Sequence, residues 1–304
     1  MPMICVPDES AVELLAPLPD GVEVVVWDGG PERPDGLDRT EFWVPQIDDP
    51  DALPERFAAL PALQVVQLLS AGVEAVVDQV PDGVVLCDAR GVHGPAVSEL
   101  VLTLVLAAQR RLPYFVDAQR AGRWDRVEAE ELRGKRVLVV GAGDLGEQTA
   151  RRLEAFDAEP VLVAHSAREG VHSTDELPEL LSGADVVVLT VPLTSATQGL
   201  VDAAFLAALP DGALLVNVAR GQVVDTDALL AELRSGRLRA GLDVVDPEPL
   251  PGEHPLWDAP NLILTPHVGS HVRETGARAY ALVREQLDRY LAGDELANVV
   301  EGEY

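Results

Sequence analysis

Short apolar runs of strand length alternate with longer segments of helical period along most of the chain. In the first third the predicted strands are MICV, VEVVVW, LQVVQLL and VVL, separated by turns rich in Pro, Gly and Asp. Such alternation is typical of parallel sheets with helical crossovers. The pattern therefore predicts an α/β architecture from the start of the chain.

A second series of apolar runs begins after residue 135. Its predicted strands are residues 136–140, 160–164, 185–190, 213–218, 239–245 and 261–265. Helical segments lie between most of them, so we predict one six-stranded dinucleotide-binding unit. The strongly apolar segment 95–111 predicts a helix that is buried on most sides, and 272–292 predicts a long amphipathic helix. We therefore expect a first domain of residues 1–94 plus 273–304 and a second domain of residues 95–272.

Composition restricts the partners and the compartment. The 304 residues carry 51 acidic and 23 basic side chains, a net charge of −28, which repels nucleic acids and anionic membranes. Lys135 is the only lysine, so an anionic ligand must be met by arginines. No apolar run is long enough to span a bilayer, the first residues do not resemble a signal peptide, and two cysteines form no disulfide framework. We expect a cytoplasmic protein.

A glycine-rich turn follows the first strand of the second series. The segment VLVVGAGDLGEQTARRL has the G-x-G-x-x-G spacing between a predicted strand and a predicted helix. In this motif the glycines allow a tight turn, close approach of a diphosphate and close packing of helix on strand. Glycines at such turns also occur for steric reasons alone. We predict that the dinucleotide contacts Gly141, Gly143, Asp144, Leu145 and Gly146.

The end of the next strand bears on the choice of cofactor. About 20 residues after the glycine motif, NAD-binding proteins place an acidic residue on the adenosine ribose. This chain has Ala164-His165-Ser166-Ala167-Arg168 there, without a carboxylate. Arg168, Ser166 and His165 would accommodate a 2′-phosphate, which favours NADP(H) and leaves NAD(H) as the alternative. The same residues would also suit an ordinary exposed loop.

Three later segments carry groups for acid–base and anion chemistry: VNVARGQVVDTDAL, AGLDVVDPEPLP and LTPHVGSH. Together with SAGVE (70–74), AVSE (96–99) and VPLTSATQGLV (191–201), they resemble the D-isomer-specific 2-hydroxyacid dehydrogenases, in the same order, over about residues 65–290. The resemblance implies a flavodoxin-like substrate-binding domain and a Rossmann cofactor domain, both doubly wound parallel sheets. It also implies an NAD(P)-dependent oxidoreductase.

By this resemblance Arg220, Glu248 and His267 would be the catalytic residues. Reduction of a 2-keto acid needs a proton for the developing alkoxide, and an imidazolium can donate it near neutral pH. Glu248 would orient the imidazole of His267, and Arg220 would bind the substrate carboxylate and carbonyl oxygen. Taken singly, Arg220 could be a turn residue, Glu248 a solvated acid and His267 a strand-end residue.

The resemblance also assigns contacts around these groups. For the cofactor it adds Val191, Pro192, Val218, Ala219, Asp243 and Gly269, although Asp243 could also be a strand-end cap. For the substrate it suggests Trp43, Val44, Ala71, Gly72 and Val73, in addition to Arg220. Trp257 in HPLW resembles a segment of glyoxylate/hydroxypyruvate reductases, and it could equally be a core residue. His267 and His271 are four residues apart, but we expect no metal site.

The expected activity is therefore hydride transfer between a nicotinamide cofactor, NADPH favoured, and a small 2-keto or D-2-hydroxy acid such as glyoxylate or hydroxypyruvate. Two alternatives remain open. One is an NAD-dependent dehydrogenase that works oxidatively, and the other is a dinucleotide-sensing interaction protein on the same scaffold. The family forms homodimers through the Rossmann domain, which implies the same here through the apolar helix after residue 94 and the segment around Trp124.

Overall fold

The computed structural model describes residues 1–301 and divides the chain into two compact units. One unit contains residues 1–93 and the segment from Arg273 onward, and the other contains residues 94–272. The divisions fall at His93–Gly94 and Val272–Arg273. Each unit has its own sheet and its own buried apolar clusters.

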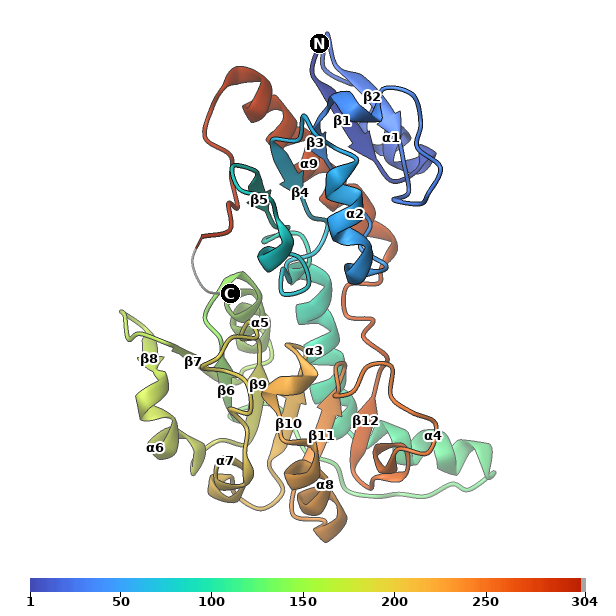
Figure 1. The fold of residues 1–304 in the computed structure, drawn as a ribbon. Coiled ribbons are helices and arrows are strands. Elements are labelled where there is room, and N and C mark those ends of the chain that lie inside the picture. The colour runs from blue at the N-terminus through green and yellow to red at the C-terminus, as the bar shows by residue number, and fades with distance from the viewer. Residues whose placement is uncertain (302–304) are drawn as a thin grey trace. The chain divides into compact units, whose positions relative to one another are not determined.

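The first unit is built on a five-stranded parallel sheet (Figure 1). Its strands are β1 (Met3–Val6), β2 (Glu23–Val26), β3 (Thr40–Trp43), β4 (Val65–Gln67) and β5 (Val85–Cys87). Their order, β2-β1-β3-β4-β5, is the flavodoxin-like doubly wound order, which confirms the predicted class for this domain. Residues 298–300 add a short antiparallel pairing along β5.

Helices cover both faces of this sheet. Ile4 and Val6 of β1 pack with α1 (Glu9–Leu15) and α9 (Arg273–Ala292), whereas Met3 and Cys5 face α2 (Leu53–Ala58). Because successive side chains of a strand point to opposite faces, both sets are buried. The long C-terminal helix predicted over 272–292 is therefore part of the first unit.

The second unit contains a seven-stranded parallel sheet in the order β12-β11-β10-β9-β6-β7-β8. The strands are β6 (Arg136–Val140), β7 (Glu159–Ala164), β8 (Val171–Ser173), β9 (Val186–Leu189), β10 (Leu214–Asn217), β11 (Arg239–Leu242) and β12 (Leu262–Leu264). Six of them were predicted, and β8 is an addition at one edge. The chain runs outward from β6 in both directions, which is the order of a Rossmann domain.

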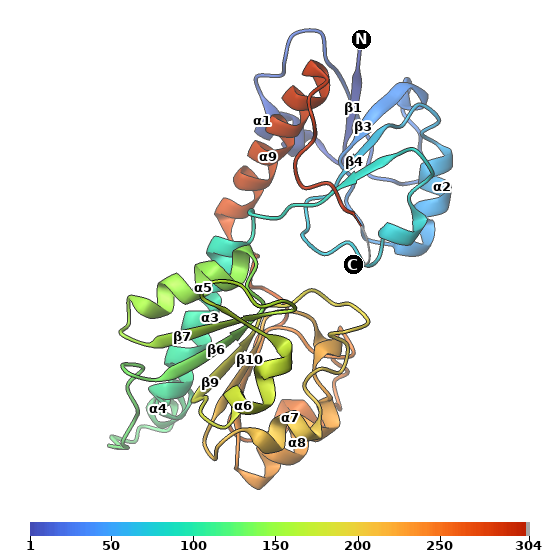
Figure 2. The same cartoon turned by 90° about the vertical axis from the view of Figure 1, so that its left-hand side faces the viewer.

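Figure 2 shows helices on both faces of the second sheet. On one face α3 (Gly94–Gln109) and α5 (Asp144–Glu154) pack against Val137 and Val139. On the other face α6 (Leu177–Leu181), α7 (Ala203–Ala208) and α8 (Thr226–Ser235) pack against Leu138 and Val140. The apolar character of α3 is thus largely accounted for inside its own unit.

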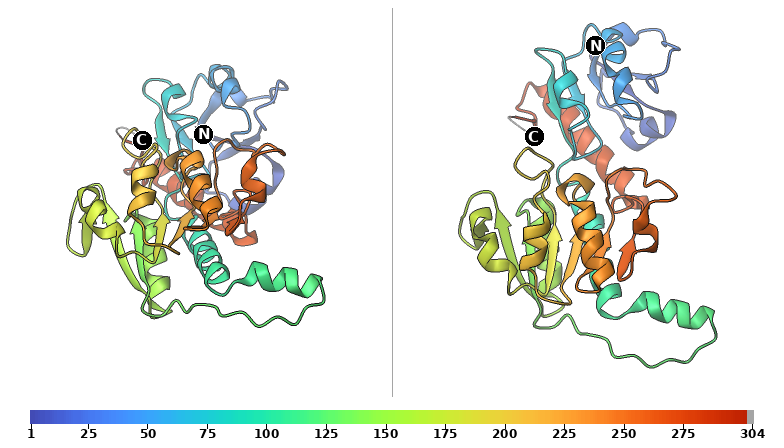
Figure 3. Two further views of the ribbon diagram at one scale, coloured as in Figure 1. Left: turned by 90° about the horizontal axis from the view of Figure 1, so that it is seen from below. Right: turned by 60° about the horizontal axis from the view of Figure 1, so that its bottom comes forward.

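One part of the second unit extends away from its sheet (Figure 3). After α3 the chain forms α4 (Leu112–Arg120) and returns through an irregular segment to β6. We call residues 112–131 the arm. Of the nine residues in α4, only Ala118 is buried. No helix within residues 1–301 has both the length and the apolarity needed to cross a membrane.

Candidate active site

The glycine-rich turn has the geometry that a diphosphate requires. A Cβ on Gly141 would come within 2.6 Å of Thr190, and one on Gly146 would overlap the carbonyl oxygen of Gly141. A Cβ on Gly143 would meet nothing within 4 Å. The first and third glycines therefore allow close packing, while the second leaves open space directly before the N-terminus of α5. Backbone N–H groups at such a helix end are a natural site for an anion.

Arg168 lies against this turn although it is 26 residues away in sequence. Its Nη2 donates a hydrogen bond to the carbonyl oxygen of Ala142 at 2.6 Å and lies 3.8 Å from Glu147. A short antiparallel bridge between Arg168 and Val171 fixes the loop after β7. His165 and Ser166 are exposed in the same loop. The structure thus places a half-exposed guanidinium next to the glycine-rich turn, with no carboxylate among residues 164–168.

The turn after β10 carries Arg220. Buried Asn217 donates through Nδ2 to the carbonyl oxygen of Arg220 at 2.9 Å and accepts from the N–H of Ala219 at 3.0 Å. This pairing fixes residues 217–220, including the buried Val218. Sequence analysis did not single out Asn217. Its position, a polar residue at the end of a buried strand and directly before the Arg220 turn, could have indicated that it fixes this turn.

Gly221 brings the next loop close to this turn. A Cβ at residue 221 would overlap the backbone carbonyl of Val245, which precedes Glu248 in the loop after β11. Any larger residue would push the two loops apart. The glycine after Arg220 therefore sets the spacing between the arginine loop and the glutamate loop.

Asp243 organises the loop that carries His267. Its carboxylate is almost completely buried and accepts hydrogen bonds from Thr265 Oγ1 at 2.6 Å and from the N–H groups of Val268 and Gly269, each at 2.9 Å. The N–H of His267 donates to the carbonyl oxygen of Asp243 at 2.7 Å. The Asp243 side chain therefore fixes the loop after β12 to the end of β11. This structural role is independent of any contact that Asp243 makes with a cofactor.

The imidazole of His267 is paired with Glu248. Nδ1 of His267 lies 2.9 Å from Oε2 of Glu248, and Oε1 of Glu248 accepts from the N–H of Val245 at 2.9 Å. His267 has a positive φ of 52°, an unusual backbone conformation for a residue with a side chain. The Asp243 contacts hold it there. With Nδ1 engaged, Nε2 is the ring atom left for proton exchange.

The order of the strands brings the three predicted catalytic residues to one edge. Arg220, Glu248 and His267 follow β10, β11 and β12, which are neighbours in the parallel sheet. A cavity of about 540 Å³ opens beside the carboxylate–imidazole pair. Besides Asp243, Glu248, Thr265 and His267, it is lined by Val245, Pro249, Leu250, Trp257, Leu264 and Pro266. Trp257 is about half exposed, so it lines this cavity and is not a core residue.

The other predicted cofactor contacts lie on the loop after β9. Val191 is half-buried and Pro192 is exposed. Thr197 Oγ1 donates to the carbonyl oxygen of Pro192 at 2.6 Å and accepts from the N–H of Thr194 at 2.8 Å. These two threonines, which sequence analysis did not single out, fix the loop after β9.

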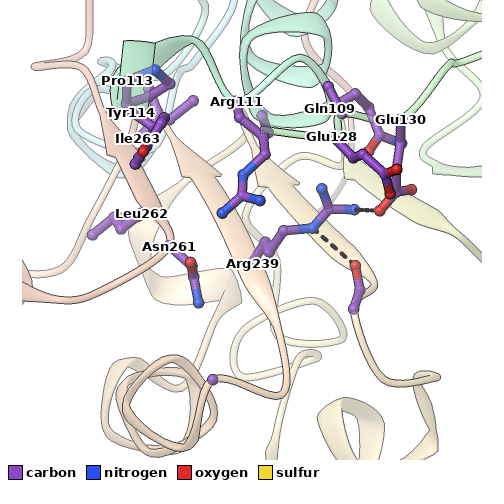
Figure 4. A pocket seen from close by; sticks show the side chains of 14 residues that line it. Gln109, Arg111, Pro113, Tyr114, Glu128, Glu130, Arg239, Asn261, Leu262 and Ile263 are labelled. Atoms are coloured by element: carbon purple, nitrogen blue, oxygen red, sulfur yellow. Dashed lines mark hydrogen bonds and ion pairs between the residues drawn. The ribbon is translucent and has the colours of Figure 1, made fainter. Parts of the chain in front are cut away.

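A second cavity, of about 520 Å³, lies at the base of the arm (Figure 4). The guanidinium groups of Arg111 and Arg239 point into it, and Arg239 approaches Glu130 at 3.9 Å. Gln109, also in its lining, is buried, and within residues 1–301 its side-chain amide has no hydrogen-bond partner. This hollow is bounded by the start and the end of the arm and lies at the opposite ends of the strands from His267.

In the first unit, the structure differs from the expectation for Trp43 and Val44. Trp43 is 1% exposed, stacks on Trp27 with ring centroids 6.1 Å apart and meets Phe57 edge-on at 5.5 Å. Val44 is fully buried on the opposite face. Both faces of β3 are covered by helices, so neither side chain has surface to offer a substrate. Ala71 and Gly72 are half-buried in the turn after β4, and Val73 is buried.

The geometry defines a nucleotide-binding dehydrogenase scaffold, and comparison with known proteins identifies its family. Residues 102–269 match the family model of the D-isomer specific 2-hydroxyacid dehydrogenase, NAD binding domain. The chain is 36% identical to D-3-phosphoglycerate dehydrogenase of Methanocaldococcus jannaschii over 229 residues, which cover 72% of this chain but only 43% of that protein.

Two solved structures are similar over nearly their whole length. A D-isomer specific 2-hydroxyacid dehydrogenase from Xanthobacter autotrophicus Py2, in complex with NADPH and MES, is 34% identical with a TM-score of 0.82 and covers 98% of each chain. An NADPH-dependent glyoxylate/hydroxypyruvate reductase from Sinorhizobium meliloti, in complex with NADP and sulfate, is 30% identical with a TM-score of 0.84 and covers 99% of this chain and 98% of that one. The chain belongs to the D-isomer specific 2-hydroxyacid dehydrogenase family of oxidoreductases.

Proposed function

We propose that this protein transfers a hydride between NADP(H) and a small 2-keto or D-2-hydroxy acid, of which glyoxylate and hydroxypyruvate are the best candidates. The observation that carries the proposal is the 2.9 Å pairing of His267 Nδ1 with Glu248. These residues follow β12 and β11, and β11 lies beside β10, which precedes Arg220. The similarity to an NADPH-dependent glyoxylate/hydroxypyruvate reductase supports the choice of substrates.

Each side chain has a distinct task in this proposal. His267 gives the proton from Nε2 to the carbonyl oxygen in reduction and takes it back in oxidation. Glu248 fixes the ring and stabilises its charged form, and Arg220 binds the carboxylate and the developing alkoxide. The backbone of Ala71, Gly72 and Val73 is a further candidate for binding the substrate carboxylate. A bound nicotinamide supplies or accepts the hydride.

The residues fit a phosphorylated dinucleotide. The open space at Gly143 suits the diphosphate, and the loop after β7 offers Arg168 and Ser166 without a carboxylate to repel a 2′-phosphate. Asp243 and Gly269 would hold the nicotinamide end, with Val191, Pro192, Val218 and Ala219 along the ring. The similar proteins solved with NADPH or NADP support the preference for NADP(H).

Steady-state kinetics would test the reaction. NADPH and NADH are each combined with glyoxylate, hydroxypyruvate, pyruvate and phenylpyruvate, with His267→Asn as the control. We expect turnover that His267→Asn lowers on the order of 10³-fold, because the proton donor is lost. Equal slow rates in both proteins, together with tight dinucleotide binding, would contradict turnover and favour the sensor alternative.

Charge reversal at the loop after β7 would test the cofactor choice. Arg168→Asp should raise KM for NADPH at least about tenfold, roughly the loss of one charge-assisted interaction, and leave KM for NADH little changed. Arg234→Asp, on an exposed position of α8, makes the same charge change elsewhere in the unit. If both variants respond alike, Arg168 does not select the cofactor.

We also propose that the protein is a homodimer that associates through the second unit. The surface that supports this is the arm, because Trp124 is 95% exposed and Leu112 is 53% exposed. Large apolar side chains at such exposure are typical of interfaces. The apolar residues of α3 add less support than the sequence suggested, since most of them pack within their own unit.

A further inference from the structure

The turn after β4 presents consecutive backbone N–H groups without acceptors. Those of Ala71, Gly72 and Val73 donate no hydrogen bond within residues 1–301. Neighbouring carbonyl groups, in contrast, are engaged. The carbonyl oxygen of Gly72 accepts from Ser70 Oγ at 2.8 Å. That of Val73 accepts from the N–H of Val76, also at 2.8 Å. A run of free N–H groups whose carbonyls are occupied elsewhere is a typical anion-binding arrangement.

Two contacts determine where this turn lies in the first unit. The carbonyl oxygen of Ser70 accepts from the N–H of Ala89 at 2.9 Å. The carbonyl oxygen of Leu69 lies 2.9 Å from Nε2 of His93. Because a carbonyl oxygen can only accept, Nε2 carries the proton and donates it. Both donors belong to the segment after β5, so this segment sets the position of the turn after β4.

The ring of His93 is well suited to act as a single donor. Its Nδ1 is buried and has no hydrogen-bond partner within residues 1–301. A protonated ring would direct a second N–H to a place without an acceptor, and burial lowers the pKa of the side chain accordingly. The neutral ring with its proton on Nε2 is therefore the favoured form.

Helix α9 fixes the backbone that carries this ring. Arg278 donates through Nε to the carbonyl oxygen of Val92 at 3.0 Å and through Nη2 to Thr275 Oγ1 at 3.1 Å. Val92 also packs in a small apolar cluster with Leu69, at the base of the turn. The position of His93 is thus defined by its neighbours on both sides, and its N–H can hold the turn in one place.

We propose that His93 is a positioning residue for the substrate carboxylate. Its N–H holds the Leu69 carbonyl, and through the backbone it keeps the N–H groups of residues 71–73 in the arrangement that binds the carboxylate of a 2-keto acid. The inference rests on the proposed function, in which this turn contacts the substrate. His93 acts through the backbone alone, so it affects affinity for the acid and not proton transfer at His267.

Oxalate is the probe for this role, because it has the carboxylate and adjacent oxygen of a 2-keto acid but cannot accept a hydride. Calorimetric titration of the full chain with NADPH bound would measure its Kd. We expect His93→Leu to raise this Kd on the order of tenfold, roughly the effect of one lost hydrogen bond. His93→Gln should stay within about threefold of the unaltered protein, because the amide can donate to the same carbonyl.

Three further measurements separate positioning from stability. His93→Asn, whose amide is too short to reach the Leu69 carbonyl, should behave as His93→Leu does. The Kd for NADPH should be the same in all variants. Gln79→Leu is the matched control, because Gln79 donates to the carbonyl oxygen of Ala75 at 2.9 Å in the same unit. Its loss removes a neutral donor without touching the turn and should change the Kd for oxalate less than about twofold.

Hydrogen exchange would locate the effect. Oxalate should slow exchange in a peptide that covers residues 69–76 of the unaltered protein and of His93→Gln. The same concentration should protect this peptide less in His93→Leu and His93→Asn. Because the peptide contains the three free N–H groups, the result reports on the turn and not on turnover.

Equal oxalate affinity in His93→Leu, His93→Asn and Gln79→Leu would overturn the proposal. An equal loss in His93→Gln would also overturn it, since the shape of the ring and not its N–H would then be responsible. If oxalate does not protect residues 69–76 of the unaltered protein, the proposed substrate contact fails and the inference fails with it. The expected oxalate pattern without turnover of any 2-keto acid would contradict the proposed function alone.

Discussion

Two carboxylates hold His267, and they do so by different means. Asp243 is 3% exposed and accepts three hydrogen bonds from the loop around His267, so it determines the backbone position of the ring. Glu248 is partly exposed and contacts the ring itself. Loss of Asp243 should therefore disturb the conformation of the loop that carries His267. Loss of the Glu248 charge should instead lower kcat.

The Glu248→Gln substitution tests this division. The amide keeps the size of the side chain but removes the negative charge that stabilises an imidazolium, so we expect kcat to fall on the order of 10²-fold with little change in thermal stability. Glu253→Gln, an exposed residue of the same loop, is the matched control. A kcat equal to that of the control would mean that Glu248 does not assist His267.

His93 should make the stability of the first unit depend on pH. Burial lowers the pKa of its side chain below 6.5, and Arg278 adds to this, although a hydrogen bond to the carbonyl oxygen of Leu69 acts in the opposite direction. The unfolded chain therefore binds a proton first as the pH falls through about 6.5, and the free energy of unfolding decreases below that pH.

Urea unfolding at pH 7.5 and 5.5 would measure the effect through the fluorescence of Trp27 and Trp43. We expect His93→Gln to flatten the dependence, and His271→Gln, which is exposed, to leave it unchanged. Carboxylates with lowered pKa, such as Glu176, titrate at lower pH and do not contribute in this window. An unaltered slope in His93→Gln would show that another group is responsible.

At the scale of elements, the period of the apolar residues predicted most of the fold. Six of the seven strands of the second sheet were predicted, as were α3 and α9. β8 was missed because Val171–Ser173 contains a single apolar residue. β3 was missed because Trp43 and Val44 were interpreted as substrate contacts, whereas helices cover both faces of the sheet and bury these two side chains.

The candidate site was predictable where its chemistry lies within one motif. The glycine turn could be identified from its spacing, and the segments of Arg220, Glu248 and His267 from their resemblance to a known family. Thr194 and Thr197 could not, because their contacts exist only in the folded loop.

The glycine turn offers a comparison between two alanine substitutions. Gly146→Ala should destabilise the protein by roughly 1–3 kcal/mol, because the methyl group would overlap the carbonyl of Gly141 and force α5 away from β6. Gly143→Ala has room and an ordinary φ of −88°, so stability should change by less than about 0.5 kcal/mol. Its methyl group enters the space proposed for the diphosphate, and dinucleotide affinity should fall at least about tenfold. Calorimetric titration with NADPH and thermal unfolding would measure both, and unchanged affinity in Gly143→Ala would move the diphosphate elsewhere.

At the scale of the whole molecule, charge opposes folding. A net charge of −28 on 304 residues makes the compact state repel itself, and nearly all the described ion pairs have at least one exposed partner. Their contribution is small, so screening of the repulsion should dominate the response to salt.

We expect the free energy of unfolding to rise by on the order of 1 kcal/mol between about 0.05 and 0.5 M NaCl. Urea unfolding at several salt concentrations would show it, and KCl should give the same result if screening is the cause. A decrease with salt would mean that ion pairs outweigh the repulsion.

The order β12-β11-β10-β9-β6-β7-β8 places the loop of Arg168 and the three loops proposed to be catalytic on opposite sides of β6 and β9. Under the proposed function, residues 164–170 can therefore be exchanged to change the choice of cofactor without altering the loops that carry Arg220, Glu248 and His267. The choice of cofactor and the chemistry on the substrate would then be able to change independently in this fold.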